Sequence, residues 1–272
     1  MPELPEVETI VRELKQAAVG KKFWKVEGRL KSVFMPSFDA VARNIKGLRI
    51  LDVTRRGKYI IFVLDKKMRL VIHLRMTGRL MWKKVKGREK FICAIFYFSD
   101  ARQLIFSDVR KFGKIYLYNE KEFEKRTGIG RLGREPLETD LKTFLKMFDS
   151  RRGILKNTLL RQDILAGVGN IYADESCFRS GFHPSSRIEK MDKKDLAKLY
   201  EAVQYCLNEG ILHCGVSVSD FVGTRGTLGK HQNYLQVYGR KGDPCYLCSK
   251  PIQKMVAAGR GTFYCLNCQK KK

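Results

Sequence analysis

The chain has 272 residues, of which 44% are hydrophobic, and this length and composition suit two folded domains. Lysine and arginine outnumber aspartate and glutamate by 54 to 28, and a net charge of +26 favours a polyanionic partner such as nucleic acid. No apolar run approaches the roughly 20 residues needed to span a bilayer. The acidic N-terminus is unlike a signal peptide. We therefore expect an intracellular protein whose scattered cysteines are reduced core thiols.

The first predicted element is an amphipathic helix over residues 3–19, because Val7, Ile10 and Leu14 recur at helical spacing. Between residues 23 and 118 the pattern changes to short β-rich runs, which indicates a sandwich or barrel. The clearest runs are Lys58–Leu64, Leu70–Leu74, Phe91–Phe98, Leu104–Phe106 and Ile115–Tyr118.

Beyond residue 130 the helical period returns, with glycine, proline and serine between the periodic stretches. The predicted helices are Leu141–Phe148, Gly169–Phe178 and Lys193–Leu212. The domain boundaries that we predict are 1–130 for a β domain, 131–237 for a helical domain and 238–272 for a basic metal-binding module.

Four cysteines near the C-terminus have the spacing of two metal-binding knuckles. Cys245-x-x-Cys248 and Cys265-x-x-Cys268 together offer four thiolates to a tetrahedral Zn²⁺. A disulfide pair or four loose thiols is the weaker interpretation without a secretory signal. Four sulfurs leave no open position for water, so we expect one structural zinc ion.

The residues between the knuckles predict a β-hairpin. Residues 251–258 and 262–264 would form its strands, joined by Gly259-Arg260-Gly261. Flanking glycines allow a close approach to a ligand, and a planar guanidinium suits bidentate phosphate binding. In so basic a chain, phosphate binding by Arg260 is favoured over a solvated turn arginine.

The N-terminus could itself be reactive. Met1 precedes the small residue Pro2, so removal of methionine would leave a secondary amine at the start of the chain. With a pKa near 8, about one-fifth of such an amine is neutral at pH 7.4, which makes Pro2 a potential nucleophile. Glu3 and Glu6 are three residues apart in the first helical turn, and one of them could act as an acid beside the amine. From these residues alone, an ordinary helix start is the better interpretation.

A longer comparison of motifs reverses that balance. The string Pro2-Glu3-Leu4-Pro5-Glu6-Val7-Glu8-Thr9 resembles the N-terminal signature of the formamidopyrimidine-DNA glycosylase (Fpg, or MutM) family. Other family-like motifs follow in the family's order over nearly the whole chain. They are Arg55-Arg56-Gly57-Lys58-Tyr59, His73-Leu74-Arg75-Met76-Thr77-Gly78, Asp108-Val109-Arg110-Lys111-Phe112-Gly113, the run from Ala166 to Glu175, and Gln236-Val237-Tyr238-Gly239.

The resemblance implies a bifunctional DNA glycosylase and abasic-site lyase of base-excision repair. Its fold would combine an N-terminal helix and β-sandwich domain with a helix-two-turn-helix domain that carries the zinc-finger hairpin. Damaged double-stranded DNA would be clamped between the two. We expect a monomer in a bacterial-type cytoplasm, associated with the nucleoid.

The resemblance also implies catalytic roles. Pro2 would attack C1′ of the damaged nucleotide and form a Schiff base, and Glu3 would protonate the sugar oxygen. Lys58 would contact phosphate and assist elimination. Arg260 would hold the phosphates that flank the lesion and assist the second elimination. Successive β and δ eliminations would leave a one-nucleotide gap.

Chemistry on a base inside a duplex requires flipping that base out and filling the hole it leaves. Met76 and Phe112 lie in predicted glycine-bearing loops and suit apolar wedges, while Arg110 can hydrogen-bond the estranged base. Asn170, at the start of a predicted helix, would bind phosphate together with backbone N–H groups. The other expected DNA contacts are Arg151, Lys156 and His73, although His73 could equally be a structural histidine and the two cations merely solvated.

The sequence departs from the family pattern at Lys90-Phe91-Ile92-Cys93, where many members carry histidine and aspartate after the lysine. A DNA contact by that histidine is therefore absent. The run Leu132-Gly133-Arg134-Glu135-Pro136 also departs from the usual pattern, at an expected interdomain linker.

Two rival functions remain open at this point. An endonuclease VIII-like enzyme would prefer oxidised pyrimidines, but residues 216–238, with Gly223, Gly226 and Gly229 in a mobile-looking stretch, resemble the lesion-capping loop of the oxidised-purine enzymes. We therefore favour 8-oxoguanine and formamidopyrimidines as substrates. A noncatalytic zinc-ribbon reader of DNA damage would have no need of a free terminal amine.

Overall fold

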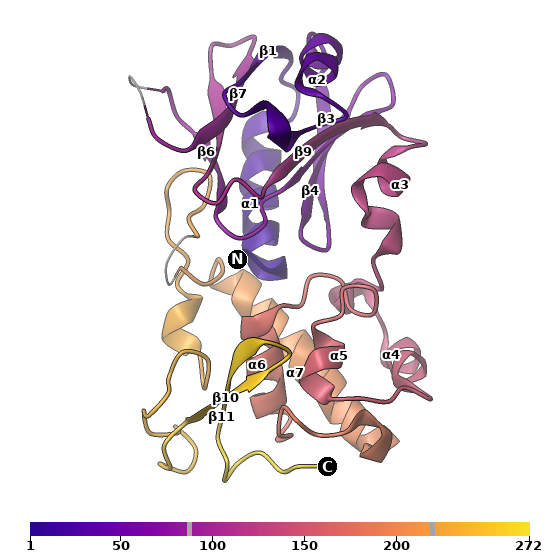
Figure 1. The fold of residues 1–272 in the computed structure, drawn as a ribbon, viewed down its shortest axis with the longest axis vertical. Coiled ribbons are helices and arrows are strands. Elements are labelled where there is room, and N and C mark those ends of the chain that lie inside the picture. The colour runs from indigo at the N-terminus through magenta and orange to yellow at the C-terminus, as the bar shows by residue number, and fades with distance from the viewer. Residues whose placement is uncertain (86–88, 218–220) are drawn as a thin grey trace. The chain divides into compact units, whose positions relative to one another are not determined.

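The computed structural model describes residues 1–85, 89–217 and 221–272, and these form two compact units. The first unit contains residues 1–131 and 213–230, and the second contains residues 132–212 and 231–272 (Figure 1). Among the described residues, no helix combines the length and the apolar character needed to cross a membrane.

The first unit is built from two sheets and a few short helices. The five-stranded sheet has the order β2-β9-β5-β4-β3, and the four-stranded sheet has the order β1-β7-β8-β6. The strands are β1 (Phe23–Gly28), β2 (Phe34–Met35), β3 (Ile50–Arg56), β4 (Tyr59–Leu64), β5 (Met68–His73), β6 (Gly78–Trp82), β7 (Ile92–Phe98), β8 (Gln103–Asp108) and β9 (Lys114–Asn119). Its helices are α1 (Leu4–Ala18), η1 (Lys31–Val33), α2 (Phe38–Ile45), α3 (Phe123–Thr127) and η2 (Ile129–Arg131), where η denotes a 3-10 helix.

One hydrophobic core joins both sheets and the first helix. Phe62 of β4 and Phe106 of β8 are fully buried in the same cluster as Leu14 of α1. In α1 the side chains of Val7, Ile10 and Leu14 are buried, so the apolar face predicted for residues 3–19 is the face that packs against β3 and β4. The predicted N-terminal helix and β-sandwich are confirmed.

The second unit is helical and ends in a hairpin. Its helices are η3 (Pro136–Glu138), α4 (Leu141–Phe148), α5 (Leu155–Leu159), α6 (Asn170–Arg179), η4 (Ile188–Lys190), α7 (Lys193–Leu212) and η5 (His231–Tyr234). The strands β10 (Gln253–Ala257) and β11 (Arg260–Tyr264) pair as an antiparallel hairpin. The hairpin turn is Ala258-Gly259, and both residues have positive φ, as a two-residue type I′ turn requires. Arg260, predicted at the hairpin tip, is therefore the first residue of β11, and the turn lies just before it.

The segment after α7 returns to the first unit. Residues 213–230 group with residues 1–131, although the sequence placed them in the helical domain. Phe221 is buried in the core of the β unit, and the N–H of Trp82 in β6 donates to the carbonyl of Thr224 at 2.9 Å. The first unit is thus completed by a segment that lies more than 80 residues beyond its last strand.

Candidate active site and DNA interface

The N-terminus of the first unit is held in place by Glu6. Met1 is 47% exposed, whereas Pro2 and Glu3 are buried beside the start of α1. Glu6 Oε2 accepts a hydrogen bond from the N–H of Glu3 at 2.7 Å, and Glu6 Oε1 accepts from the N–H of Val216 at 2.9 Å. Glu6 is therefore an acceptor that fixes backbone, while Glu3, the cap residue of the helix, stands next to Pro2. The exposed methionine is accessible for removal.

The turn that carries Lys58 is fixed by a second glutamate of the N-terminal motif. Gly57, with a φ of 54°, makes the tight turn between β3 and β4, and Lys58 is only 6% exposed. Arg55 Nε donates to Glu8 Oε2 at 3.0 Å, and Arg55 also donates to the carbonyl of Gly57 at 3.0 Å. Burial would raise the pKa of Glu8, but hydrogen bonds from Arg12 and Arg55 lower it overall, which keeps this carboxylate ionised. The Glu8–Arg55 pair thus joins α1 to the Lys58 turn.

His73, at the end of β5, is buried and neutral. Its Nδ1 accepts a hydrogen bond from the N–H of Arg75 at 3.0 Å, so in the neutral ring the proton lies on Nε2. Burial, together with the charges of Arg75 and Lys58, lowers the pKa of His73 to about 3. A neutral ring with an Nε2–H donor can still bind a phosphate oxygen. The position of His73 is therefore consistent both with a phosphate contact and with a structural role.

The three residues predicted to fill the gap left by a flipped base lie together. Arg110 Nη1 is 3.0 Å from Met76 Sδ, and the Arg110 guanidinium lies 4.9 Å from the centre of the Phe112 ring. Met76 is 39% exposed and Phe112 is 51% exposed, so neither belongs to the core. Two loops far apart in the sequence therefore present one exposed group of an apolar, a cationic and an aromatic side chain.

A buried aspartate ties these two loops to each other. Asp108 is 1% exposed, and its carboxylate accepts from the Thr77 hydroxyl and from the N–H groups of Arg110 and Gly113, the latter at 2.7 Å. The departure from the family pattern lies beside them, because the N–H of Asp108 donates to the carbonyl of Phe91 at 2.9 Å. Phe91 is 50% exposed with a φ of 64°, so this chain has a strained, exposed aromatic residue next to the loop.

In the second unit the four cysteines form a metal site. All four sulfur atoms lie within 4.8 Å of one another, with Cys245 and Cys268 at 3.9 Å and Cys248 and Cys265 at 3.4 Å. A tetrahedral zinc ion with Zn–S bonds of about 2.3 Å would place its sulfurs about 3.8 Å apart. The arrangement fits one structural zinc ion with all four positions taken by thiolates.

Arg260 and Asn170 are connected through the hairpin backbone. Arg260 is exposed on β11, and the next residue, Gly261, accepts a hydrogen bond through its carbonyl from Asn170 Nδ2 at 3.0 Å. Asn170 is the first residue of α6, so the helix N-terminus and the hairpin arginine lie on adjoining segments of the second unit. These are the two predicted phosphate contacts that the structure brings together.

Lys156 differs from the sequence expectation. It was expected on the DNA-facing surface with Arg151, but its side chain is 0% exposed. Its Nζ is 2.6 Å from Asp174 Oδ1 and donates to the Thr262 hydroxyl at 2.7 Å. Because a buried ammonium requires such partners, Lys156 in this structure supports the hairpin rather than facing solvent.

Two acids of α6 hold the zinc-binding module, and the sequence analysis missed their role. Asp174 Oδ2 accepts from the N–H of Phe263 in β11 at 2.9 Å. Glu175, which is 5% exposed, accepts from the N–H groups of Gln236, Val237 and Tyr238 at 2.8 to 3.0 Å. Both acids belong to the motif from Ala166 to Glu175, and the three N–H groups belong to the motif Gln236-Val237-Tyr238-Gly239. The presence of both motifs in one chain was the sequence feature that could have indicated this contact.

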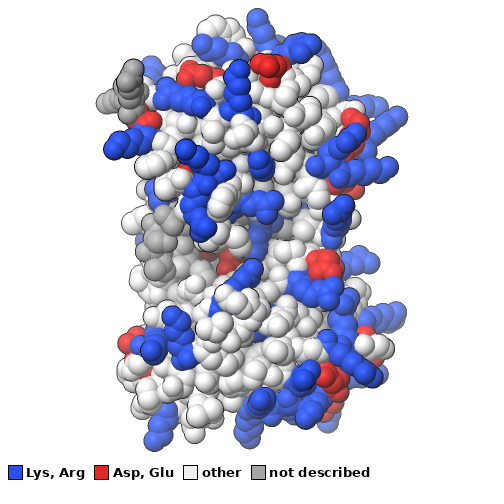
Figure 2. Space-filling model, in the orientation of Figure 1, with Lys and Arg blue, Asp and Glu red and all other residues white. Residues whose placement is uncertain are grey.

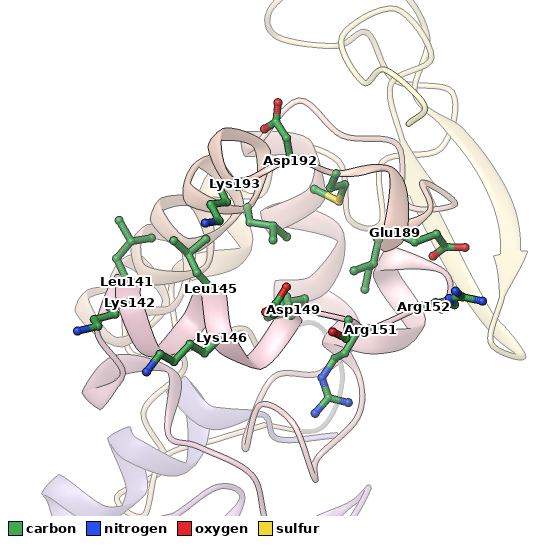
Figure 3. Close-up of a pocket in the computed structure, with 15 residues that line it drawn as sticks. Leu141, Lys142, Leu145, Lys146, Asp149, Arg151, Arg152, Glu189, Asp192 and Lys193 are labelled. Atoms are coloured by element: carbon green, nitrogen blue, oxygen red, sulfur yellow. The ribbon is translucent and has the colours of Figure 1, made fainter.

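A large hollow lies elsewhere in the second unit. It has a volume of about 1210 Å³, with leucines of α4 at its wall and basic residues at its rim (Figure 3). Of the predicted site residues, Arg151 alone is among the residues that line it. More broadly, Figure 2 shows lysine and arginine side chains spread over the visible surface of both units, with few acidic groups among them.

The first unit is a β-sandwich with a buried proline at position 2, and the second is a helical unit that carries a four-cysteine hairpin and an asparagine at a helix N-terminus. Together these features define a class of zinc-finger proteins that bind DNA. Three family models match the chain in order. They are the formamidopyrimidine-DNA glycosylase N-terminal domain at residues 1–115, the helix-two-turn-helix (H2TH) domain of the same enzyme at residues 132–222, and the zinc finger found in FPG and IleRS at residues 242–271.

Complete relatives agree with these models. The formamidopyrimidine-DNA glycosylase of Heliobacterium modesticaldum is 41% identical over 99% of this chain and 100% of its own. Two solved complexes of Lactococcus lactis Fpg are 35% identical with a TM-score of 0.93, over 99% of this chain and 100% of theirs. One is a glycine-to-proline mutant bound to DNA that contains Fapy-dG, and the other is bound to DNA that contains an abasic site. The chain belongs to the formamidopyrimidine-DNA glycosylase family.

Proposed function

We propose that this protein is a base-excision repair enzyme that removes oxidised purines from duplex DNA and then cleaves the abasic strand. The observation that carries the proposal is the buried Pro2–Glu3 pair at the start of α1, held by Glu6 and preceded by an exposed Met1. Family membership and the Fapy-dG and abasic-site DNA of the Lactococcus complexes support it. The protein would act as a monomer on the DNA of a bacterial-type nucleoid.

The proposed reaction begins once Met1 has been removed. The lone pair of the Pro2 nitrogen forms a bond to C1′ as the glycosidic bond breaks, and the departing base takes up the proton that the Pro2 nitrogen then loses. Glu3 protonates the ring oxygen as the C1′–O bond opens, which gives the iminium. Loss of a C2′ proton expels the 3′ phosphate, with Lys58 nearby on its fixed turn. Loss of a C4′ proton then expels the 5′ phosphate, assisted by Arg260.

The remaining residues are proposed to bind the duplex. Met76, Arg110 and Phe112 would occupy the space of the flipped nucleotide, because they form one exposed group held by Asp108. His73, Asn170 and Arg151 would contact phosphates. Lys156 would contribute by supporting the hairpin that bears Arg260, as its burial against Asp174 indicates.

Borohydride trapping tests the proposal. Protein shown by mass spectrometry to begin at Pro2 is incubated with a duplex that contains 8-oxoguanine opposite cytosine, or with one that contains an oxidised pyrimidine. We expect a cross-link at Pro2 that forms faster on the purine duplex. The matched control keeps an uncleavable N-terminal extension, which turns the Pro2 nitrogen into an amide, and it should bind the duplex without cross-linking.

Two outcomes would contradict the proposal. Faster trapping on the pyrimidine duplex would move the enzyme to the endonuclease VIII-like specificity. Tight binding without any cross-link by protein that begins at Pro2 would leave a noncatalytic reader of damage as the better function.

A further inference from the structure

Glu13 of α1 holds the returning segment at Thr224. Glu13 Oε2 accepts hydrogen bonds from the N–H of Thr224 and from its hydroxyl, the latter at 2.7 Å. Glu13 Oε1 accepts from the Thr227 hydroxyl at 3.2 Å. On its other side, the Thr224 carbonyl accepts from the N–H of Trp82, and Thr224 is only 1% exposed. Thr224 is therefore clamped between α1 and β6.

The glycines of this segment serve close packing. A Cβ at Gly223 would lie 2.6 Å from Glu13 Oε1, and one at Gly229 would lie 2.2 Å from the carbonyl oxygen of Gly215. A side chain at Gly229 would overlap the backbone, and one at Gly223 would displace the Glu13 carboxylate, so these two glycines allow the backbone to lie close to α1 and to the start of the same segment. Among the three glycines that made the stretch look mobile, only Gly226 has open space around it.

The same helix carries a second attachment point. Glu6 accepts from the N–H of Val216, and Glu13 lies seven residues further along α1, about 10.5 Å along the helix axis. The described residues on either side of positions 218–220 are thus both bound to α1, the helix that starts beside Pro2. Residues 218–220 themselves lie outside the described residues and form no part of the inference.

We propose that Glu13 is a positioning residue for base excision. It fixes residues 221–229, which belong to the stretch expected to cover a flipped base, in register with the helix that presents Pro2. The inference rests on the proposed function. Excision requires the damaged base to be held in place, whereas elimination at a preformed abasic site has no base to hold. Glu13 therefore matters for the first reaction and not for the second.

The test compares single-turnover rates on two duplexes, one with 8-oxoguanine opposite cytosine and one with a preformed abasic site. In E13A the three donors lose their charged acceptor, and we expect excision to slow by about tenfold or more while strand cleavage at the abasic site changes by less than about twofold. T224V, which keeps the side-chain shape but loses the hydroxyl donor, should slow excision to an intermediate extent. The double variant should be no slower than E13A, because both changes break one contact.

E124Q is the matched control, since Glu124 is an exposed acid on α3 in the same unit and its neutralisation changes the net charge equally. It should leave both rates unchanged. The abasic-site rate also reports folding, and T224V carries the test if E13A proves misfolded. Unchanged excision in E13A and T224V, or an equal loss of both reactions, would overturn the role of Glu13. Failure of the wild type to process either duplex would instead refute the proposed function.

Discussion

The buried pair between Lys156 and Asp174 allows a quantitative prediction. Both side chains are 0% exposed and their charged atoms are 2.6 Å apart, so removal of either partner leaves an uncompensated buried charge. Such losses cost about 3–5 kcal/mol. The remaining group can escape the cost only by becoming neutral, and burial raises the pKa of the Asp174 carboxyl even though the Lys156 ammonium opposes that rise. The two single variants should therefore depend on pH in opposite directions.

In K156M the carboxyl group would be protonated in the folded protein. From an ordinary pKa near 3.9, this costs about 4 kcal/mol at pH 7 and about 1.5 kcal/mol at pH 5. In D174N the amine would be deprotonated, which from a pKa near 10.4 costs about 4.5 kcal/mol at pH 7 and about 2 kcal/mol at pH 9. K156M should thus be least harmful in acid, and D174N least harmful in alkali.

Denaturant unfolding of the zinc-loaded protein at pH 5, 7 and 9 measures these losses, each against the wild type at the same pH. The double variant K156M/D174N removes both charges and should be more stable than the sum of the single losses predicts, by about 2 kcal/mol or more. Single losses below about 1 kcal/mol, or losses that do not vary with pH, would show that the pair is not the buried ion pair described above.

Three further perturbations have defined outcomes. The pKa of His73 is about 3 in the folded protein and near 6.5 when unfolded, so only the unfolded chain takes up this proton between those values and stability falls as pH falls. We expect a loss of about 2 kcal/mol between pH 6.5 and pH 5 from this residue, visible in denaturant unfolding and absent in H73N. D108N keeps one acceptor oxygen for the three donors in the loops that carry Met76 and Phe112, so it should lower the free energy of unfolding by about 2 kcal/mol. In D108N, the fluorescence change of a base analogue placed opposite the lesion, which reports its unstacking when the protein binds, should also be smaller. Wild-type behaviour in both assays would contradict the role given to Asp108. Metal analysis should find one zinc ion per chain, and C248S or chelation should expose the amides of β10 and β11 to hydrogen exchange; protection that survives metal loss would show that zinc is not needed to hold the hairpin.

The sequence predicted those features whose cause is local. The spacing of the apolar residues predicted the buried face of α1, and the spacing of the four cysteines predicted the metal site. Helices α4 and α7 have the predicted bounds, because polar and turn-forming residues flank their periodic apolar patterns. The exposed group of Met76, Arg110 and Phe112 was also predicted, from loops that glycines marked.

What the sequence could not provide was the choice of partner for charged side chains. Glu13 and Thr224 are 211 residues apart, and no local pattern links them. Lys156 resembled a surface cation, because one lysine between apolar residues does not reveal that Asp174 lies next to it. The assignment of residues 213–230 to the first unit depends on the same long-range contacts, since the segment directly follows a helix of the second unit.

These contacts also explain how so basic a chain uses its acids. Glu6, Asp108 and Glu175 are buried, and each accepts hydrogen bonds from backbone N–H groups that fix a loop or a motif proposed to serve DNA binding or catalysis. Acids in such positions accept hydrogen bonds inside the protein, and on the face shown in Figure 2 lysine and arginine outnumber the acidic side chains. Neutralising a buried acid should therefore lower stability, whereas neutralising exposed lysines should lower DNA affinity and its salt dependence with little effect on stability. The two kinds of substitution should act on different properties, because the buried acids hold loops whereas the exposed cations are proposed to contact phosphates.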